Sequence, residues 1–583
     1  MTPLHKDAVF DVIIAGGGPA GCVLANRLSE DTSQQILLVE AGSDVIPGEE
    51  HPDVLDPFPT SDGNPTFLWP NLVAETGAKS QNGASRKKEP YIQGYGIGGG
   101  SNINGMGADR GNPEDYDEWR DLGAEGWGWS DVLPYFRKLE RDLDFSSAPL
   151  SSMHGGSGPM PVRRLPRAHW APFASAIGVA LERRGFSFLE DYNADFREGF
   201  SAAPKNCSPE QRISTSMAYL TQEVRRRKNL TIVADSRVDR VSITHRRADG
   251  VFVSRKGRTS LVRGRQVILS CGALQTPAVL MRSGIGPGHH LVSHGIEVIT
   301  DLPGVGANLQ NHPCILLAMY LARDAHQSGT NREFLQNWAR FSSNEPNCAP
   351  NDMHLIPFNR CAWHNLGRSI GAIAIAVFKS YSKGYVNLSG ADPAKAPNIH
   401  FNLLADTRDF DRLVGGFRFV LELLTDPAVA RTRDQIFFPN SRMVASMSRR
   451  NWANHLMANA GAWALDREIL RRIFLSRNAL DPRELLGNED TLRDLVRAYA
   501  QPEYHVCGTC RIGNARDPSA VVDSEAQVIG IEALRIVDAS TFPTLPRANT
   551  HFTVLMVAEK LADAIKSTWR VHRSSLATYA SVP

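Results

Sequence analysis

The sequence has no apolar run long enough to cross a membrane as a helix, because such a helix needs about 20 consecutive apolar residues. It also has no internal repeat and no low-complexity segment. Its 42% apolar and 22% charged residues are ordinary for a soluble globular protein, which excludes a disordered chain. The formal net charge of +2 argues against nucleic acid as the main partner. A chain of 583 residues predicts two or more domains.

The eight cysteines do not follow a disulfide-like spacing, as is typical of a reducing compartment. The first apolar strand begins about ten residues after Met1, which leaves no room for a signal peptide. We therefore expect a cytoplasmic protein. Cys507 and Cys510 form a C-x-x-C motif, but no second cysteine pair lies near enough in the sequence to complete a zinc site. We interpret this pair as core packing and predict no metal site.

Residues 10–28 have the pattern of a strand, a tight glycine turn and the start of a helix. Val12–Ile14 form a short apolar strand, and Pro19 and Ala20 begin the helix. Three glycines complete a G-x-G-x-x-G pattern at the turn: Gly16, Gly18 and Gly21. The first permits the turn, the second lets a pyrophosphate approach the backbone, and the third lets the helix pack on the strand. The helix N-terminus then offers free N–H groups to the phosphates.

A second apolar strand, residues 35–39, ends in an acidic residue. This residue, Glu40, lies nineteen positions after Gly21, where a dinucleotide fold has a carboxylate for the ribose 2′-hydroxyl. An acid at this position disfavours a 2′-phosphate. The pattern therefore predicts an NAD-like or FAD-like ligand and does not distinguish between the two.

The rest of the chain predicts more than one sheet. Residues 94–105 form a second glycine-rich loop, whose backbone can lie flat against a ligand. Residues 113–140 read as helical. Residues 229–271 alternate like strands and predict a small sheet appended to the nucleotide domain. A second, mixed α/β domain is indicated from about residue 315, with strands and helices expected at 372–378, 385–388, 406–425 and 479–499.

Three segments together resemble the glucose–methanol–choline (GMC) oxidoreductase family. They are the N-terminal glycine turn, the loop Gly98–Asn104 and the segment Gly272–Gly286. Two C-terminal segments, 505–513 and 549–560, strengthen the likeness. Within the family, residues 115–136 are most similar to the bacterial choline dehydrogenase and 5-hydroxymethylfurfural oxidase branch.

This resemblance implies an α/β fold with two domains. One is a Rossmann-type FAD-binding domain, and the other is an inserted, mixed α/β substrate-binding domain. We predict the first at residues 8–160, 205–312 and 500–572. We predict the second at residues 161–204 and 313–499.

The resemblance also implies FAD as the cofactor. The residues expected to bind it are Gly16, Gly18, Pro19, Ala20, Gly21, Glu40, Ala41, Gly98, Gly99, Ser101, Asn104, Gly105, Val238, Asp538, Ala539, Asn549 and Thr550. Of these, Asn104 is expected near the flavin ring and Val238 is expected to hold the adenine through its backbone. Asp538 is expected beside the ribityl chain or the pyrimidine. Ile103 stands where choline oxidase has a flavin-linking histidine, so we predict non-covalent FAD.

The implied chemistry is the oxidation of an alcohol. His505 matches the family's catalytic histidine, and a neutral imidazole can accept the hydroxyl proton near pH 7. His551, where the nearest branch usually has asparagine, is expected to hydrogen-bond the substrate oxygen. It would lie at the N-terminal end of a helix whose dipole stabilises negative charge. Tyr504 could line the substrate pocket or belong to the core.

We expect a primary alcohol as substrate, aromatic or furanic, with O2 or another compound as electron acceptor. Three alternatives stay open on the same fold. They are a hydroxynitrile lyase, a light-driven decarboxylase and a flavin-binding protein without activity. The intact pair of His505 and His551 argues against the last. The sequence does not indicate the oligomeric state.

Overall fold

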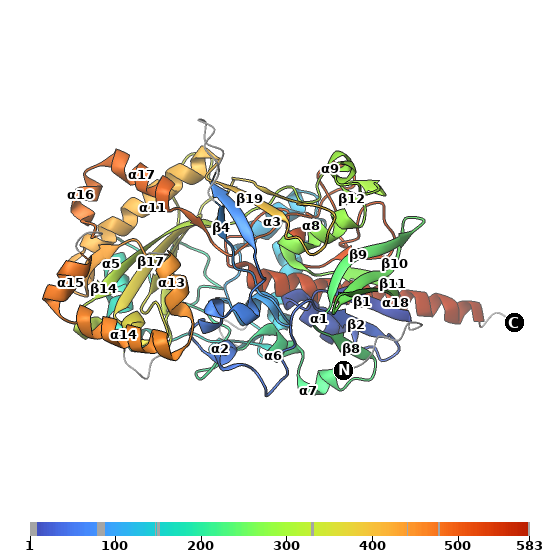
Figure 1. Ribbon diagram of the computed structural model, residues 1–583, viewed down its shortest axis with the longest axis horizontal. Coiled ribbons are helices and arrows are strands. Elements are labelled where there is room, and N and C mark those ends of the chain that lie inside the picture. Colours follow the sequence, from blue (N-terminus) through green and yellow to red (C-terminus); the bar gives the residue numbers. More distant parts are fainter. Residues whose placement is uncertain are drawn as a thin grey trace.

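The computed structural model describes residues 9–77, 88–145, 147, 152–327, 332–439, 441–475 and 479–580. Two large sheets lie side by side along the long axis of the molecule, each with helices packed on it (Figure 1). A search of the described residues for a helix long and apolar enough to span a membrane found none.

The first sheet contains the predicted nucleotide-binding strands. Its order is β8-β2-β1-β11-β10-β9, with β22 pairing with β11. The parallel strands are β1 (Val9–Ala15), β2 (Ile36–Val39), β8 (Leu230–Val233), β11 (Arg258–Leu269) and β22 (Leu534–Ile536). In the register, Val12 of β1 lies between Ile36 of β2 and Gln266 of β11. The buried apolar residues of β1 and β2 therefore form the centre of the sheet, as their sequence predicts.

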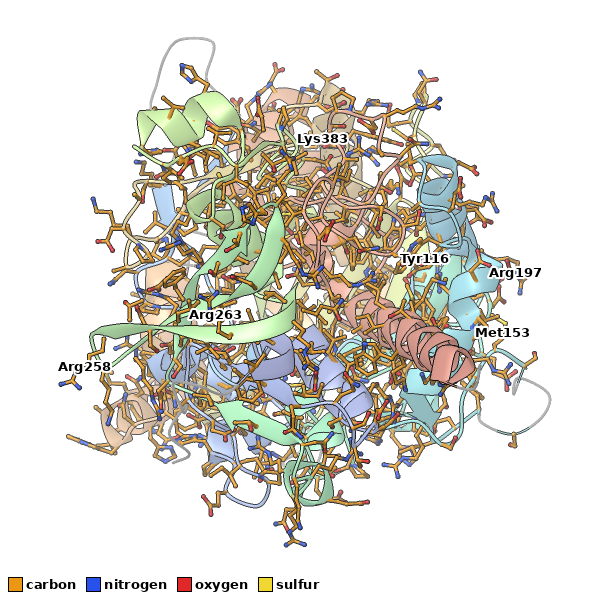
Figure 2. The ribbon with its side chains drawn as sticks, turned by 90° about the vertical axis from the view of Figure 1, so that its right-hand side faces the viewer. Tyr116, Met153, Arg197, Arg258, Arg263 and Lys383 are labelled. Atoms are coloured by element: carbon orange, nitrogen blue, oxygen red, sulfur yellow. The ribbon has the colours of Figure 1, made fainter. Side chains whose placement is uncertain are left out.

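The prediction of a separate small sheet at residues 229–271 is wrong in part. β8 and the second half of β11 belong to the central parallel sheet, and only β9 (Arg237–Thr244), β10 (Arg247–Arg255) and the first half of β11 form an antiparallel extension. In Figure 2, Arg263 and Arg258 mark the outward course of β11 away from the central sheet. The polar first half of β11 pairs with β10, and its apolar second half pairs with β1. The periodicity of the sequence does not reveal that one long strand has these two different partners.

Helices pack against this sheet and against one another. α1 (Pro19–Leu28) packs along α18 (Thr550–Ala580), where Arg27 pairs with the buried Glu559 at 2.8 Å. The predicted helical stretch 113–140 consists of α3 (Pro113–Asp121) and α4 (Trp129–Leu139), separated by a turn that contains three glycines. α8 (Gly272–Arg282) follows β11 directly. Residues 113–140 are therefore helical as predicted but interrupted.

The second sheet is antiparallel and has the order β20-β14-β17-β16-β15-β7, with β21 on β14. Its strands are β7 (Gly199–Ala202), β14 (Pro313–Leu321), β15 (Asn337–Phe341), β16 (Met353–Phe358), β17 (Ile370–Val377), β20 (Arg433–Phe437) and β21 (Gln501–Pro502). α5 (Pro172–Arg183) and α11 (Thr407–Thr425) cover the face that carries Ile315 and Leu317. Cys314 and Leu316 alternate with these residues and point to the opposite face, which packs on Met106 of the glycine-rich loop region.

Smaller elements complete the chain. A third sheet has the order β18-β19-β3-β4, formed by β18 (Tyr385–Asn387), β19 (Asn398–Leu403), β3 (Val73–Gly77) and β4 (Lys88–Pro90). The predicted helix at 479–499 consists of α16 (Pro482–Leu486) and α17 (Glu489–Tyr499). β21, which lies in the predicted FAD-binding segment 500–572, pairs with the second sheet. The predicted domain boundaries otherwise stay a prediction.

Candidate active site

The two glycine-rich loops touch each other at the end of β1. The N–H of Gly98 donates to the carbonyl of Gly17 at 2.7 Å. A Cβ at Gly21 would lie 1.9 Å from the carbonyl oxygen of Gly16, so this helix packs too closely for any side chain. A Cβ at Gly18 would meet nothing nearer than 4.0 Å, so its backbone faces open space. The loop therefore fits a dinucleotide, with room for a pyrophosphate beside Gly18.

The predicted adenosine-side residues gather where β2 ends. The Glu40 carboxylate is buried and accepts hydrogen bonds from the N–H groups of Gly17, at 2.7 Å, and Gly42, at 2.8 Å. Burial raises the pKa of Glu40, and these N–H groups oppose that shift. The Ser236 N–H donates to the Glu40 carbonyl, and Val238 follows two residues later on the edge strand β9. The carboxylate keeps further lone pairs for ribose hydroxyls.

Asp538 joins the end of β22 to the start of α8. Its carboxylate accepts from the Gly272 N–H at 2.9 Å, the Thr276 hydroxyl at 2.6 Å and the Ser540 N–H at 2.8 Å. Ala539 is the next residue. Both lie at the carboxyl ends of the parallel strands, where α/β sheets bind their ligands.

The loop that contains Ser101 and Asn104 is held from one side by a short segment of the chain. Ser101 Oγ accepts from the Thr215 N–H at 3.0 Å. Arg212 is fully buried and donates to both the backbone carbonyl and the side-chain oxygen of Asn104, at 2.6 and 2.8 Å. Burial lowers the pKa of Arg212 to about 10. We refer to residues 98–105 as the flavin loop.

His551 lies in the first turn of α18, as predicted. Its Nε2 is 3.0 Å from the hydroxyl of Thr215, the residue that also holds the flavin loop. Its Nδ1 is buried and has no hydrogen-bond partner among the described residues. Burial lowers the pKa of His551 to about 4, and the nearby charge of Arg212 acts in the same direction. The ring is therefore neutral at pH 7, and one nitrogen is available to a ligand.

Asn549 and Thr550 mark the start of the same helix. The Asn549 N–H donates to the carboxylate of the buried Asp109 at 2.9 Å. The side chain of Asn549 lies against Gly107, because a Cβ there would approach its amide nitrogen to 2.4 Å. These two contacts hold the N-terminus of α18 beside Gly107 and Asp109, which follow the flavin loop in the sequence. The positive end of the helix dipole can stabilise negative charge there.

His505 is held by a second histidine, His312. The two Nδ1 atoms are 2.9 Å apart, and His312 Nε2 is 3.1 Å from the carbonyl of Phe378. Burial lowers the pKa of His505 to about 4 and that of His312 well below its usual range, so both rings are neutral at pH 7. Because a carbonyl oxygen only accepts, His312 carries its hydrogen on Nε2, and its Nδ1 accepts from His505 Nδ1–H.

The consequence for His505 is a fixed tautomer. With the hydrogen on Nδ1, the lone pair is on Nε2, and this atom has no hydrogen-bond partner in the described part of the chain. The other ring nitrogen sets which nitrogen of a histidine can act as a base. His505 is therefore oriented to accept a proton at Nε2.

Tyr504 is 59% exposed, so of the two predicted alternatives the core position is wrong, and the pocket position stays a prediction. Its ring lies 5.4 Å from that of Tyr91. Between the flavin loop and the uncovered face of the second sheet lies an apolar cluster that is rich in aromatic residues: Met106, Phe334, Leu335, Trp338, Ile356, Phe358 and Phe378.

Sequence reasoning missed three residues that position the site: His312, Arg212 and Thr215. Each belongs to a segment far from the motif that it supports, so spacing in the sequence gave no signal.

Cys507 and Cys510 are fully buried and burial raises the pKa of both thiols, which makes them unreactive.

A further buried histidine, His154, lies outside this site. His154 Nδ1 is 3.0 Å from Glu140 and 3.1 Å from Asp142, and its Nε2 is 2.6 Å from Asp191. Glu140, Asp142 and His154 are close enough to share a cation. Two buried arginines, Arg110 and Arg164, already donate to the same carboxylates.

A parallel sheet with a glycine turn at the end of β1, a second glycine-rich loop and two neutral histidines together fit a flavin-dependent oxidoreductase. The family profile of GMC oxidoreductases matches residues 10–314 with its N-terminal part and 380–558 with its C-terminal part. The chain therefore belongs to the GMC oxidoreductase family, whose members are FAD-dependent enzymes.

Individual relatives agree with this assignment. The chain is 38% identical to a 5-(hydroxymethyl)furfural oxidase of Methylovorus sp., over 96% of this chain and 99% of the relative. It is 31% identical to an oxygen-dependent choline dehydrogenase of Chromohalobacter salexigens, over 98% and 97% of the two chains. The solved structure of pyridoxine 4-oxidase from Mesorbium loti superposes with a TM-score of 0.78 at 26% identity, covering 95% of this chain and 99% of that one.

Proposed function

We propose that this enzyme oxidises a primary alcohol, aromatic or furanic, to the aldehyde, with non-covalently bound FAD and His505 as the general base. The observation that carries the proposal is the hydrogen bond between His312 and His505, which leaves Nε2 of His505 free to take the hydroxyl proton. FAD, which Gly18, Glu40 and the flavin loop would hold, would supply the acceptor for the hydride of the alcohol carbon and would pass the electrons to O2 or another acceptor.

The apolar cluster beside the flavin loop supports an alcohol with a flat, apolar body. It includes Phe334 and Phe358, whose rings are parallel with centroids 6.0 Å apart, and Phe378, whose ring centre lies 6.1 Å from that of His505. His551, through its unpartnered Nδ1, would hydrogen-bond the substrate oxygen and fix the position of the hydroxyl. Apolar side chains around the site would exclude water, which strengthens the hydrogen bonds of the substrate hydroxyl with His505 and His551. Furanic and aromatic alcohols fit this combination of one polar end and one apolar body.

Three features of the structure support FAD as the cofactor. They are the open space beside Gly18, the carboxylate of Glu40 and the contact between the two glycine-rich loops. Ile103 lacks a nucleophilic side chain, which supports a non-covalent cofactor. Acid precipitation of the purified protein should therefore release the flavin into the supernatant. A pellet that stays yellow would contradict this part of the proposal.

The test of the reaction is anaerobic mixing of the purified protein with a panel of alcohols. We expect an aromatic or furanic primary alcohol to bleach the flavin absorbance and to yield one aldehyde per flavin. His551→Asn, which introduces the residue common in the nearest branch, should slow bleaching less than His551→Ala. Turnover of a hydroxynitrile with the flavin still oxidised would instead identify a lyase.

A further inference from the structure

Large apolar side chains are concentrated on one exposed surface. α13 (Ser441–Ser448), α14 (Trp452–Leu465) and α15 (Glu468–Leu475) lie together at one end of the molecule, opposite the nucleotide-binding sheet (Figure 1). Eight of the large hydrophobic residues with exposed surface fall in this short stretch: Met443, Val444, Trp452, Leu456, Met457, Trp463, Ile469 and Ile473. The remaining ones are scattered singly over the other described residues. We call these three helices the helical tip.

The apolar residues of the helical tip follow helical spacing. Trp452, Leu456 and Trp463 lie at i, i+4 and i+11, which places them on one face of α14, and they are 78%, 59% and 60% exposed. Ile469 and Ile473 repeat the i, i+4 spacing on α15, at 75% and 62% exposed. Monomeric soluble proteins rarely expose contiguous apolar patches of this kind without a binding partner.

The same segment is strongly basic. Residues 441–475 contain six arginines and two acids, a net charge of +4, while the rest of the chain carries −2. Arg450, Arg471 and Arg472 pair with Asp56, Asp434 and Glu468. Arg449 and Arg467 are exposed and have no acidic partner among the described residues, and the guanidinium of Arg467 lies 3.4 Å from the ring centre of Trp463. Arginine beside tryptophan and aliphatic residues on a helix surface is the composition of helices that lie in the interface of an anionic membrane.

The tip is anchored to the body of the protein. α13 packs on the 3-10 helix η1 (Thr60–Gly63), and the hydroxyl of Ser61 in η1 donates to the Asn102 carbonyl in the flavin loop at 2.6 Å. On the other side, Trp363 donates to the Ser448 carbonyl at 3.0 Å. A partner that binds the exposed face would thus hold the whole enzyme in one orientation.

We propose that the helical tip docks on the surface of a membrane rich in anionic lipid, with α14 and α15 lying in the interface. Charge complementarity selects this occupant. A second copy of the chain would bring two surfaces of the same positive sign together, which is unfavourable. An anionic lipid surface instead attracts the arginines and accepts the tryptophans and isoleucines at headgroup depth.

The test is sedimentation of the full-length, FAD-loaded enzyme with vesicles of phosphatidylcholine alone or mixed with phosphatidylglycerol. We expect binding to the mixed vesicles, with little binding to phosphatidylcholine and weaker binding as salt is added. The double variant Trp452→Ser/Trp463→Ser should lose at least tenfold in affinity. The double variant Arg449→Gln/Arg467→Gln should lose about fivefold for each arginine removed.

The matched control replaces exposed apolar residues elsewhere, Val292→Ser with Leu122→Ser, at 67% and 43% exposure. It should bind vesicles like the unmodified enzyme. Because all these positions are exposed, flavin content and turnover of each variant should be unchanged, which separates docking from folding and from the proposed reaction. Absence of vesicle binding would overturn the proposal. A dimer in sedimentation that Trp452→Ser/Trp463→Ser dissociates would overturn it in favour of a second copy.

Discussion

The two histidines of the candidate active site, His505 and His551, differ from the buried His154 in their charge at pH 7. His505 and His551 have no carboxylate partner, and burial lowers the pKa of each to about 4. For His154, burial acts in the same direction, but hydrogen bonds to Asp142, Asp191 and Glu140 outweigh it and raise its pKa to about 10. The comparison shows that the neighbours of a buried histidine decide its function. A ring without acids is available as a base, and a ring among acids is a fixed cation.

The largest effect should come from removing the base. His505→Ala should keep its FAD and reduce the flavin with substrate about 10²–10⁴-fold more slowly, because a positioned general base contributes this much. The measurement is anaerobic stopped-flow bleaching of the flavin. Reoxidation by the electron acceptor should stay unchanged. An unchanged bleaching rate would remove His505 from the proposed chemistry.

His154→Leu should show the opposite profile, a loss of stability. The substitution removes the imidazolium from between the three buried carboxylates, which keep only Arg110 and Arg164, and breaking a buried ion pair costs about 3–5 kcal/mol. The free energy of unfolding from urea titration checks this, with His505→Leu as the matched control. Since His505 has no charged partner, its replacement should cost much less. Equal losses in the two variants would contradict the comparison.

Because the pKa shifts of the two kinds of histidine have opposite directions, we expect the free energy of unfolding to fall on both sides of neutral pH. For His505 and His551, the folded pKa is below the unfolded value of 6.5, so the unfolded chain binds more protons and stability falls between pH 6.5 and about 4. For His154, the folded pKa is above 6.5, so its contribution is complete below pH 6.5 and is lost as pH rises through about 10. Urea midpoints measured across pH should show both slopes. His154→Leu should remove only the alkaline one.

A smaller effect is expected at His312, which positions His505 without contacting substrate. His312→Leu removes the acceptor for His505 Nδ1–H, and a buried unpaired donor costs about 1–3 kcal/mol, so flavin reduction should slow by about fivefold to a hundredfold. His312→Asn should restore much of the rate, because its side-chain oxygen can replace Nδ1 as the acceptor. A purely structural role would show no such rescue.

The last effect concerns cofactor retention and leaves the reaction rate of the loaded enzyme aside. Glu40→Ala removes charge-assisted hydrogen bonds to ribose, which contribute about 1.5–3 kcal/mol each, so the dissociation constant of FAD should rise about tenfold or more. Titration of the apoprotein with FAD, followed by flavin fluorescence, measures this change. The loops at Gly17 and Gly42 also lose their acceptor. An unchanged dissociation constant would exclude Glu40 from the cofactor site.

The sequence by itself determined the elements whose signal is local. The glycine turn with Glu40, the parallel strands β1 and β2, and helices α8, α11 and α18 follow from spacing and apolar periodicity, since these interactions involve residues close in the chain. The resemblance to GMC oxidoreductases, carried by the same local motifs, indicated His505 and His551 and the family assignment.

Only the tertiary structure decided which distant residues complete the site. Arg212 reaches Asn104 across more than one hundred residues, and His312 reaches His505 across nearly two hundred. It also decided that β11 crosses between two ladders and that His154 is charged. These features depend on which side chains meet in three dimensions, and burial and electrostatic interactions act between neighbours in space, whatever their distance along the chain.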